Sequence, residues 1–390
     1  MRIIKTASLV LGLSACCAIC YADSPPLGAA SAYNLVALGY LSTPGDINGP
    51  GVSSDVTGRI AAAGYITSAT TIGSAFQSVD NTTNDPWGSL ANGYAVVAGA
   101  GISASGTFDI NGGGNVYAPT NAASYFFNDG GHLVTSGPSP INFGALATSL
   151  DTESLQLAAY APSASETGTV CSYSSASCAP AETGSIRSNT SLTVLYGSSS
   201  TLNVFDLTAA QFASTSNALD IEVPVGSTVI VNVAGTSVTL GQSVYFNGSE
   251  ESVNNDDGGN ILFNFAGAST VSIDGQVDGA VLAPFAVLTA NCGQMGGTVV
   301  AAEIDDNSCQ MENAEFNGIL PTISLTPEPG TLVLMGTGML SLAGMVRRRK
   351  RAGAGSVCQP EAGAELAGRW ESGNAAPGHR SPRESRTRRL

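Results

Sequence analysis

Carboxylates are the residues that this chain could most readily use for chemistry. Glycoside hydrolysis needs only two of them, about 5 to 9 Å apart, one acting as acid and the other as base or nucleophile. Close pairs in the sequence are Asp256 with Asp257, Asp274 with Asp278, and Glu303 with Asp305 and Asp306. Such pairs are common in an acidic chain, so none of them identifies a catalytic site, and most are expected to be solvated.

Histidine gives no stronger indication of catalysis. A Ser-His-Asp or Cys-His catalytic site within residues 23–321 would depend on His132, which ends the turn sequence Asn128-Asp129-Gly130-Gly131-His132 with no nucleophile elbow nearby. The Gly-rich residues 112–114 open no helix and have no Lys beside them, which excludes a phosphate-cradling loop. We therefore predict that the protein is not an enzyme.

Calcium is an alternative use of clustered oxygen ligands. Residues 254–260, Asn-Asn-Asp-Asp-Gly-Gly-Asn, offer carboxylate and amide oxygens on a turn, and Ca²⁺ accepts such ligands. The spacing of an EF-hand is absent. The sequence thus predicts no cofactor, with calcium at this turn as the one alternative.

Four cysteines remain when the two ends of the chain are set aside. Cys171 and Cys178 close a Ser-rich loop, and Cys292 and Cys309 bracket a β segment. A metal site would need His or a CxxC spacing, so disulfides are favoured, paired by proximity in an oxidising compartment. Loop-entropy estimates put their stabilisation at roughly 2.5 and 3 kcal/mol.

The charges divide the chain into two parts of opposite character. Residues 23–326 hold 25 Asp and Glu against Arg59 and Arg187, with no Lys, giving a net charge of −23. Binding phosphates requires clustered Lys and Arg, so nucleic acid is excluded as a partner of this part. Its 300 or so residues are rich in Gly, Ala, Ser, Thr and Val, which favours a β protein with many tight turns.

The N-terminus is typical of a secretory signal peptide. Arg2 and Lys5 precede an apolar run, residues 7–19, and a small residue, Ala22, stands before the predicted cut. We therefore assign residues 1–22 to a signal removed by signal peptidase. An alternative is lipidation at Cys16, because Leu13-Ser14-Ala15-Cys16 is similar to a bacterial lipobox.

The C-terminal part has three segments in a specific order. Pro327-Glu328-Pro329 lies in a Pro-rich linker, residues 322–330, and an uncharged apolar run follows at residues 331–346. The basic cluster 347–351 comes next, including Arg347, Arg348 and Arg349. As a helix the 16-residue run would rise about 24 Å, a marginal membrane span, and the positive-inside rule keeps the cluster cytoplasmic.

This order resembles the PEP-CTERM sorting signal of Gram-negative bacteria that produce exopolysaccharide. The resemblance implies that an exosortase recognises Pro327, Glu328, Pro329 and the basic cluster, and that the body passes from the inner membrane to the cell surface or matrix. An ordinary tail anchor is the alternative. Residues 352–390 depart from the pattern, because such proteins usually end soon after the basic cluster; their composition predicts disorder.

The body, residues 23–321, shows many short apolar runs bounded by turn residues. Apolar residues occupy every second position in the stretches 221–225, 229–233 and 238–240, which places Glu222, Asn232 and Thr239 on the opposite face. Residues 279–283 recur as 297–301, 18 residues later, and 115–119 are similar to 280–284. A repeat of this length matches one coil of a β-solenoid, with a β-sandwich as the alternative.

One helix is predicted beside the strands. Phe143, Leu146, Leu150, Leu157 and Tyr160 share a face of period 3.6, bounded by Pro140 and Pro162. The predicted fold is mostly β: a β-solenoid like a right-handed parallel β-helix, with one lateral α-helix along it and a C-terminal transmembrane sorting helix.

The body resembles the choice-of-anchor A domain over about residues 32–321. The resemblance rests on these stretches: Tyr33 to Tyr40, Asp55 to Gly64, Leu202 to Thr208, Ile261 to Phe265, and Val281 to Pro284. It implies an adhesin-like extracellular domain with a β-helical body related to ice-binding folds, without enzymatic activity. It supplies no ligand-binding residues.

The predicted function is that of an exported adhesin, or a biofilm or exopolysaccharide-associated structural protein. One alternative is a β-helical enzyme acting on polysaccharide, but lyase chemistry uses basic residues and only Arg59 and Arg187 are present. Another is ice binding, which needs a regular array of Thr or similar residues, and no such array of fixed spacing is visible in the sequence.

Overall fold

The computed structural model describes residues 25–49, 55–73, 87–172, 192–213, 218–241, 243–250, 256–307 and 309–321. The chain divides into two units, Met1–Ile323 and Ser324–Leu390, and all described residues belong to the first. The signal peptide, Cys16, Cys178, Arg187 and everything from the linker to Leu390 lie outside the described residues, so those assignments stay predictions. Within the described ranges, no helix is long and apolar enough to cross a membrane.

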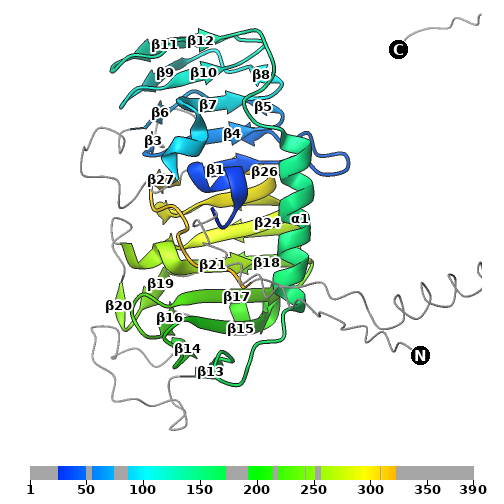
Figure 1. The fold of residues 1–390 in the computed structure, drawn as a ribbon, viewed down its shortest axis with the longest axis vertical. Helices are drawn as coiled ribbons and strands as arrows, with labels where there is room; N and C mark the ends of the chain where they lie inside the picture. Colours follow the sequence, from blue (N-terminus) through cyan, green and yellow to red (C-terminus); the bar gives the residue numbers. More distant parts are fainter. Residues whose placement is uncertain are drawn as a thin grey trace, which may run out of the picture. The chain divides into compact units, whose positions relative to one another are not determined.

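The body is a β-helix of stacked, mainly parallel strands, as predicted (Figure 1). Each circuit of the chain, here called a rung, passes through three faces in turn. Face A holds one strand from almost every rung. In stacking order its strands are β12 (Leu133–Val134), β10 (Asn115–Tyr117), β7 (Tyr94–Ala98), β4 (Ile60–Ala62), β1 (Leu35–Ala37), β26 (Val299–Asp306), β24 (Ala280–Ala290), β21 (Ile261–Asn264), β17 (Thr228–Ala234) and β15 (Leu202–Thr208).

Face B belongs to the same hydrogen-bonded sheet, because β24 and β26 are long enough to turn the corner from face A. The pairing of β24 with β26 shifts register at that corner, between Ala283 and Val287. The other strands of face B are β8 (Gly101–Ile102), β5 (Tyr65–Ile66), β2 (Ile47–Asn48), β22 (Thr270–Ile273) and β18 (Ser237–Leu240).

Face C consists of two sheets. The seven-stranded sheet has the order β11 (Ser124–Phe127), β9 (Thr107–Ile110), β6 (Thr71–Ile72), β3 (Asp55–Val56), β27 (Gln310–Glu312), β25 (Gln294–Gly296) and β23 (Val277–Asp278). The five-stranded sheet has the order β13 (Thr169–Ser172), β14 (Leu192–Tyr196), β16 (Ala218–Glu222), β19 (Ser243–Phe246) and β20 (Ser249–Glu250). The N–H of Val244 in β19 donates to the Gln276 carbonyl just before β23, which joins the two sheets.

The rungs do not stack in the order of the sequence. From β1 the chain builds in one direction to β12, crosses the body, and then builds from β13 back to β27 (Figure 1). Leu35 of β1 therefore pairs with Ile60 on one side and with Val299 on the other. The first rung and the last rung of the body meet in the middle of the stack.

The 18-residue repeat is confirmed as two adjacent rungs. Val281, Leu282 and Ala283 pair in register with Val299, Val300 and Ala301. Gly279 and Gly297 form the matching corners, with φ of +148° and +130°. A Cβ on Gly297 would lie 2.5 Å from the Gly279 carbonyl oxygen, so stacking at this corner requires glycine. The parallel register rules out the alternative β-sandwich.

The predicted helix is confirmed as α1, Phe143–Ala159. The Asn142 side chain caps its N-terminus by accepting a hydrogen bond from the Ala145 N–H, and the buried residues include Leu146, Leu150 and Leu157. The helix packs on the outer side of face A against β24, β21 and β17 (Figure 1). A ladder of amides fixes it there: Asn264 Nδ2 donates to the Ser154 carbonyl, and Asn232 Nδ2 donates to the Leu157 carbonyl.

One detail of the strand prediction is wrong. The alternation predicts Val225 on a core face, but this residue lies between β16 and β17 and its side chain is 75% exposed, because the strand ends at Glu222. Asn232 lies on the face opposite the interior, as expected, yet it is buried because α1 covers that face.

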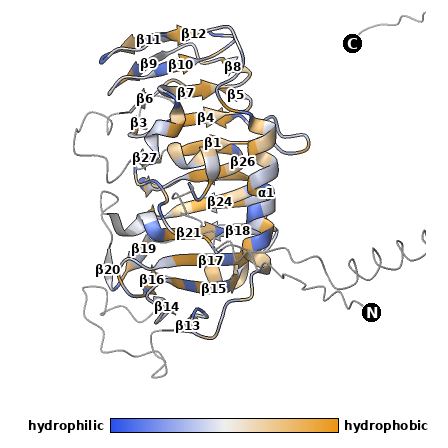
Figure 2. Cartoon of the chain, viewed as in Figure 1, coloured by the Kyte–Doolittle hydropathy of each residue, from blue (hydrophilic) through white to orange (hydrophobic). Residues whose placement is uncertain are grey.

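Apolar side chains of all three faces fill the interior. Figure 2 shows that the strands carry most of the apolar residues. Small residues predominate where rungs stack closely, as in the register of Ala61 with Val97 and of Ala62 with Ala98. The disulfide between Cys292 and Cys309 is present and buried, while the predicted Cys171 to Cys178 pair has one member outside the described residues.

Candidate functional site

Of the sequence-predicted catalytic candidates, Glu303 and Asp305 lie on the same face of the body, where Asn48 Nδ2 donates to both. His132 is exposed, and its backbone N–H donates to Asn115 Oδ1. Asp274 is exposed and accepts hydrogen bonds from Ser272 and Asn291, whereas Asp278 is only 2% exposed. Asp306 is buried and accepts the Cys309 N–H. Arg59, one of the two cations that a lyase could use, is paired with Glu315 inside the body.

Metal binding has no support among the described residues, where no group of three or more His, Cys, Asp and Glu side chains could hold an ion. Of the candidate calcium turn, residues 254–260, the structure describes only residues 256–260. Those residues form a short 3₁₀ helix, Asp256–Asn260, and residues 254–255 lie outside the described ranges.

Face B instead presents two parallel rows of outward side chains, one residue of each row per rung. We call them row one and row two. Row one contains Ser237, Thr270, Val287, Glu303, Asp46 and Tyr65, and the next position in register is Gly101, which has no side chain. Row two contains Thr239, Ser272, Thr289, Asp305, Asn48, Thr67 and Ser103. Every member of row two is a small hydroxyl, carboxylate or carboxamide residue.

The geometry of the sheet sets the spacing of these rows. Neighbouring rungs lie about 4.8 Å apart, and residues two apart in one strand lie about 6.6 Å apart. Alternation directs the intervening residues, such as Val238, Val271, Leu288 and Ile304, into the interior, where all four are buried. The rows are thus a regular surface of hydrogen-bonding groups fixed to a rigid scaffold.

Hydrogen bonds between rungs hold the centre of this surface in place. Asn48 Nδ2 donates to Glu303 Oε1 at 3.1 Å and to Asp305 Oδ1 at 3.0 Å. Thr67 Oγ1 donates to Asn48 Oδ1 at 3.1 Å, and Thr270 Oγ1 donates to Ser237 Oγ at 3.0 Å. The side chains are therefore ordered before any ligand arrives, which lowers the entropy cost of binding.

Three carboxylates lie close together at the middle of face B. Burial raises the pKa of Glu303, the charges of Asp305 and Asp46 raise it further, and the Asn48 hydrogen bond opposes them. Asp305 lies two residues from Glu303 on the same outward side of β26, and Asp46 lies just before β2, on the neighbouring rung. This part of the surface is rich in carboxylates, whereas the β18 and β22 rungs offer uncharged hydroxyls.

Sequence reasoning missed row two because its members come from rungs that stack out of chain order. The residue numbers 239, 272, 289, 305, 48, 67 and 103 have no constant spacing. Face B nevertheless carries a regular array of hydrogen-bonding side chains, although the positions of these residues in the sequence have no fixed spacing. Only the 18-residue repeat pointed to part of it, since Thr289 and Asp305 follow the two repeated segments.

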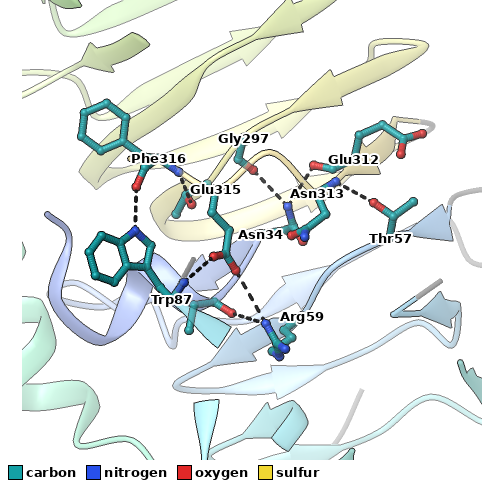
Figure 3. A network of polar contacts seen from close by, with 11 residues as sticks. Asn34, Thr57, Arg59, Trp87, Gly297, Glu312, Asn313, Glu315 and Phe316 are labelled. Carbon is teal, nitrogen blue, oxygen red and sulfur yellow. Dashed lines mark hydrogen bonds and ion pairs between the residues drawn. The ribbon is translucent and has the colours of Figure 1, made fainter. Parts of the chain in front are cut away.

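A second polar cluster is buried where the first and last rungs meet (Figure 3). Asn34 Nδ2 donates to the Glu312 carbonyl at 2.9 Å and to the Gly297 carbonyl at 3.3 Å. Glu315, fully buried, lies 3.6 Å from the Arg59 guanidinium and accepts the Trp87 N–H. These groups bind one another and hold the two halves of the body together, so we assign this cluster to structure.

Comparison with solved structures finds ice-binding proteins at low similarity. One from the Antarctic ascomycete Antarctomyces psychrotrophicus is 12% identical with a TM-score of 0.34, over 76% of this chain and 100% of that chain. One from an Antarctic biological consortium is 11% identical with a TM-score of 0.31, over 80% and 95%. A glycosylated one from Arctic yeast is 14% identical with a TM-score of 0.28, over 78% and 98%. No curated protein matches the chain.

Family models match both parts of the chain. The PEP-CTERM protein-sorting motif matches residues 325–350, which supports export, exosortase processing and sorting to the cell surface. The model described as "Putative Ice-binding-like adhesive domain" matches residues 26–313, nearly the whole β body. The chain is therefore a PEP-CTERM protein that belongs to the ice-binding-like adhesive domain family.

Proposed function

We propose that this protein is a non-enzymatic adhesin of the cell surface or extracellular matrix, and that face B binds a hydroxyl-rich polymer such as exopolysaccharide. The proposed polymer binding rests on row two, in which seven successive rungs offer hydrogen-bonding groups in register. A polysaccharide presents hydroxyls repeatedly along its length, so many weak contacts at fixed spacing add into useful avidity.

The route to the surface is part of the same proposal. Signal peptidase removes residues 1–22 and exosortase acts at the motif around Pro327, Glu328 and Pro329, so the membrane contact through residues 331–346 is transient. The match to the PEP-CTERM sorting motif supports the exosortase step and the export of the body, and we propose that both take place in a Gram-negative cell. We further propose that the body is of the choice-of-anchor A type, on the stretches that resemble it.

Ice binding is the second candidate, and one observation favours it. Thr239, Ser272 and Thr289 form an uncharged hydroxyl stretch of row two. Against it, the same face carries the carboxylates Asp305, Glu303 and Asp46, which interrupt the uncharged hydroxyl stretch. Thermal hysteresis of the purified protein decides: a measurable gap between melting and freezing would favour ice over polysaccharide.

Replacing Thr289 by Tyr should weaken polymer binding. The bulkier side chain stands up from the middle of row two and removes one hydroxyl, so we expect about a tenfold loss of affinity, equivalent to one or two hydrogen bonds. The measurement is co-sedimentation of the mature protein with exopolysaccharide purified from the producing cells. Thr152→Tyr, on the exposed side of α1, is the matched control and should bind as the wild type does. Equal loss in both variants, or in neither, would contradict the assignment of face B.

Deleting residues 327–351 should abolish stable display. Without the sorting motif, the apolar run and the basic cluster, nothing retains the chain for exosortase, so the body should be released into the medium or remain in the periplasm. Immunoblots of surface, periplasmic and medium fractions report this. A control deletion of residues 352–390 should leave display intact. Unchanged display of the 327–351 deletion would contradict the proposed route.

A further inference from the structure

The rung farthest along the stack from β15 is open at its outer edge. This end rung comprises residues 121–134, with β11 on face C and β12 on face A (Figure 1). β11 is the terminal strand of the seven-stranded sheet and β12 the terminal strand of the large sheet. Among the described residues, neither has a strand beyond it. Open edges of this kind pair readily with further strands, and natural proteins usually block them.

The backbone groups on that edge can be identified. The N–H of Ser124 donates to Gly106 and the N–H of Asn128 to Ile110, so even-numbered residues of β11 bond inward to β9. The two-residue period of a ladder then directs the N–H and C=O groups of Tyr125 and Phe127 outward. In β12 the carbonyls of His132 and Val134 accept from β10, which directs the Leu133 groups outward.

Aromatic side chains cover the core at this end and extend beyond it. The rings of Phe108, Tyr125 and Phe127 form a stack, with centroid separations of 5.8 and 5.6 Å. Tyr125 and Phe127 are half-buried, whereas Phe126 is 64% exposed beside the open edge. The end rung thus combines unpaired backbone groups with apolar surface, the combination that strand addition uses.

A contact between two end rungs brings few charges together. The end rung carries one carboxylate, Asp129, one histidine, His132, and no Lys or Arg. Two copies that meet only at this rung therefore bring one Asp129 from each copy to the contact. A larger contact between two bodies of net charge −23 would bring many more carboxylates together.

The opposite end of the stack is protected and lies near the exit of the chain. Thr167 bridges to Val204 of β15, and β13 pairs antiparallel with β14. The segment after β27 runs back toward that end, where the Ile319 N–H donates to Thr228 Oγ1 at the start of β17. The described body therefore leads into the sorting motif from the half that does not contain the end rung.

We propose that the end rung binds the end rung of a second copy of this chain, with β11 antiparallel to its symmetry mate. A strand pairs with an identical strand about a two-fold axis without any further adaptation, and such isologous contacts close as dimers. The contact lies in the opposite half of the stack from Ile319, near the end of the described residues. It is independent of polymer binding by face B.

The experiment compares the mature protein with two variants in sedimentation-velocity ultracentrifugation over a concentration series. We expect a reversible monomer–dimer equilibrium for the wild type. Phe126→Lys places two like charges across the two-fold axis and should make the protein monomeric. Val225→Lys, an exposed apolar residue near the protected end, is the matched control and should dimerise as the wild type does. A monomeric wild type at its highest soluble concentration, or equal dimerisation of both variants, overturns the proposal.

Hydrogen exchange tests the same contact without any substitution, and so does not depend on the variants folding. Amides of Tyr125, Phe127 and Leu133 should exchange fast in dilute protein and become protected as the concentration rises. Protection confined to some other part of the body would overturn the proposal. Protection of these amides only after a foreign extended peptide is added, with none at high protein concentration, would assign the edge to a heterologous strand and overturn it as well.

Discussion

Glu315→Gln is expected to lower the free energy of unfolding by about 3 to 5 kcal/mol, the cost of breaking a buried ion pair by removing one partner. Glu315 is fully buried and Arg59 is 13% exposed, with 3.6 Å between their charged atoms. Their interaction joins the segment after β27 to β4, and thus the end of the body to its beginning (Figure 3). The neutral amide leaves the Arg59 charge without its partner in a poorly solvated place.

Urea unfolding monitored by circular dichroism measures this loss as a lower midpoint at unchanged slope. Asp55→Asn makes the same chemical change at an exposed carboxyl and should shift the midpoint little. Replacing both Arg59 and Glu315 by Met should recover much of the stability, since a matched apolar pair leaves no buried charge. If the single and double variants lost equal stability, the ion pair would not be the cause.

Gly58→Ala is expected to cost about 3 kcal/mol or more, through overpacking and loss of buried hydrogen bonds. A Cβ at position 58 would overlap Asn34 Oδ1 and lie 2.5 Å from Asn313 Oδ1. Asn34 cannot move aside without giving up its bonds to the carbonyls of Gly297 and Glu312. One methyl group would therefore disturb the contact between the first rung and the last.

The thermal midpoint and the urea midpoint should both fall for Gly58→Ala. Gly144→Ala is the control, because the nearest atom to its Cβ would be Asn142 Oδ1 at 3.8 Å and alanine is the better helix former. It should be neutral or stabilising. Adding Asn34→Ser to Gly58→Ala should relieve the overlap and make the two losses less than additive. Strict additivity would argue that residue 58 acts elsewhere.

Local pattern predicted the elements of this fold well. The period-3.6 face from Phe143 to Tyr160 became α1, and the 18-residue recurrence of residues 279–283 became two adjacent rungs, because both signals lie within one segment of sequence. Val225 was misplaced since alternation by itself cannot tell a strand from the turn that follows it.

The order in which the rungs stack could not be predicted from the sequence. Nothing in residues 35–37 indicates that they lie between residues 60–62 and 299–301. Row two of face B depends on that order, so a search for fixed spacing could not find it. The same holds for Glu315: a single acidic residue near the end of the body gave no sign of its partner 256 positions earlier.

Insertion of β1 between β4 and β26 has a consequence for the order in which the body can fold. The amino-terminal rungs lack one neighbour in the stack until residues 299–312 are available to pair with them, and contacts so distant in sequence form slowly. The sorting motif at 325–350 begins only 13 residues after β27 ends at Glu312. The last strand that the fold needs and the sorting motif are therefore nearly adjacent in the sequence, so a chain cut short before Glu312 would lack both the neighbour of β3 and the signal for sorting.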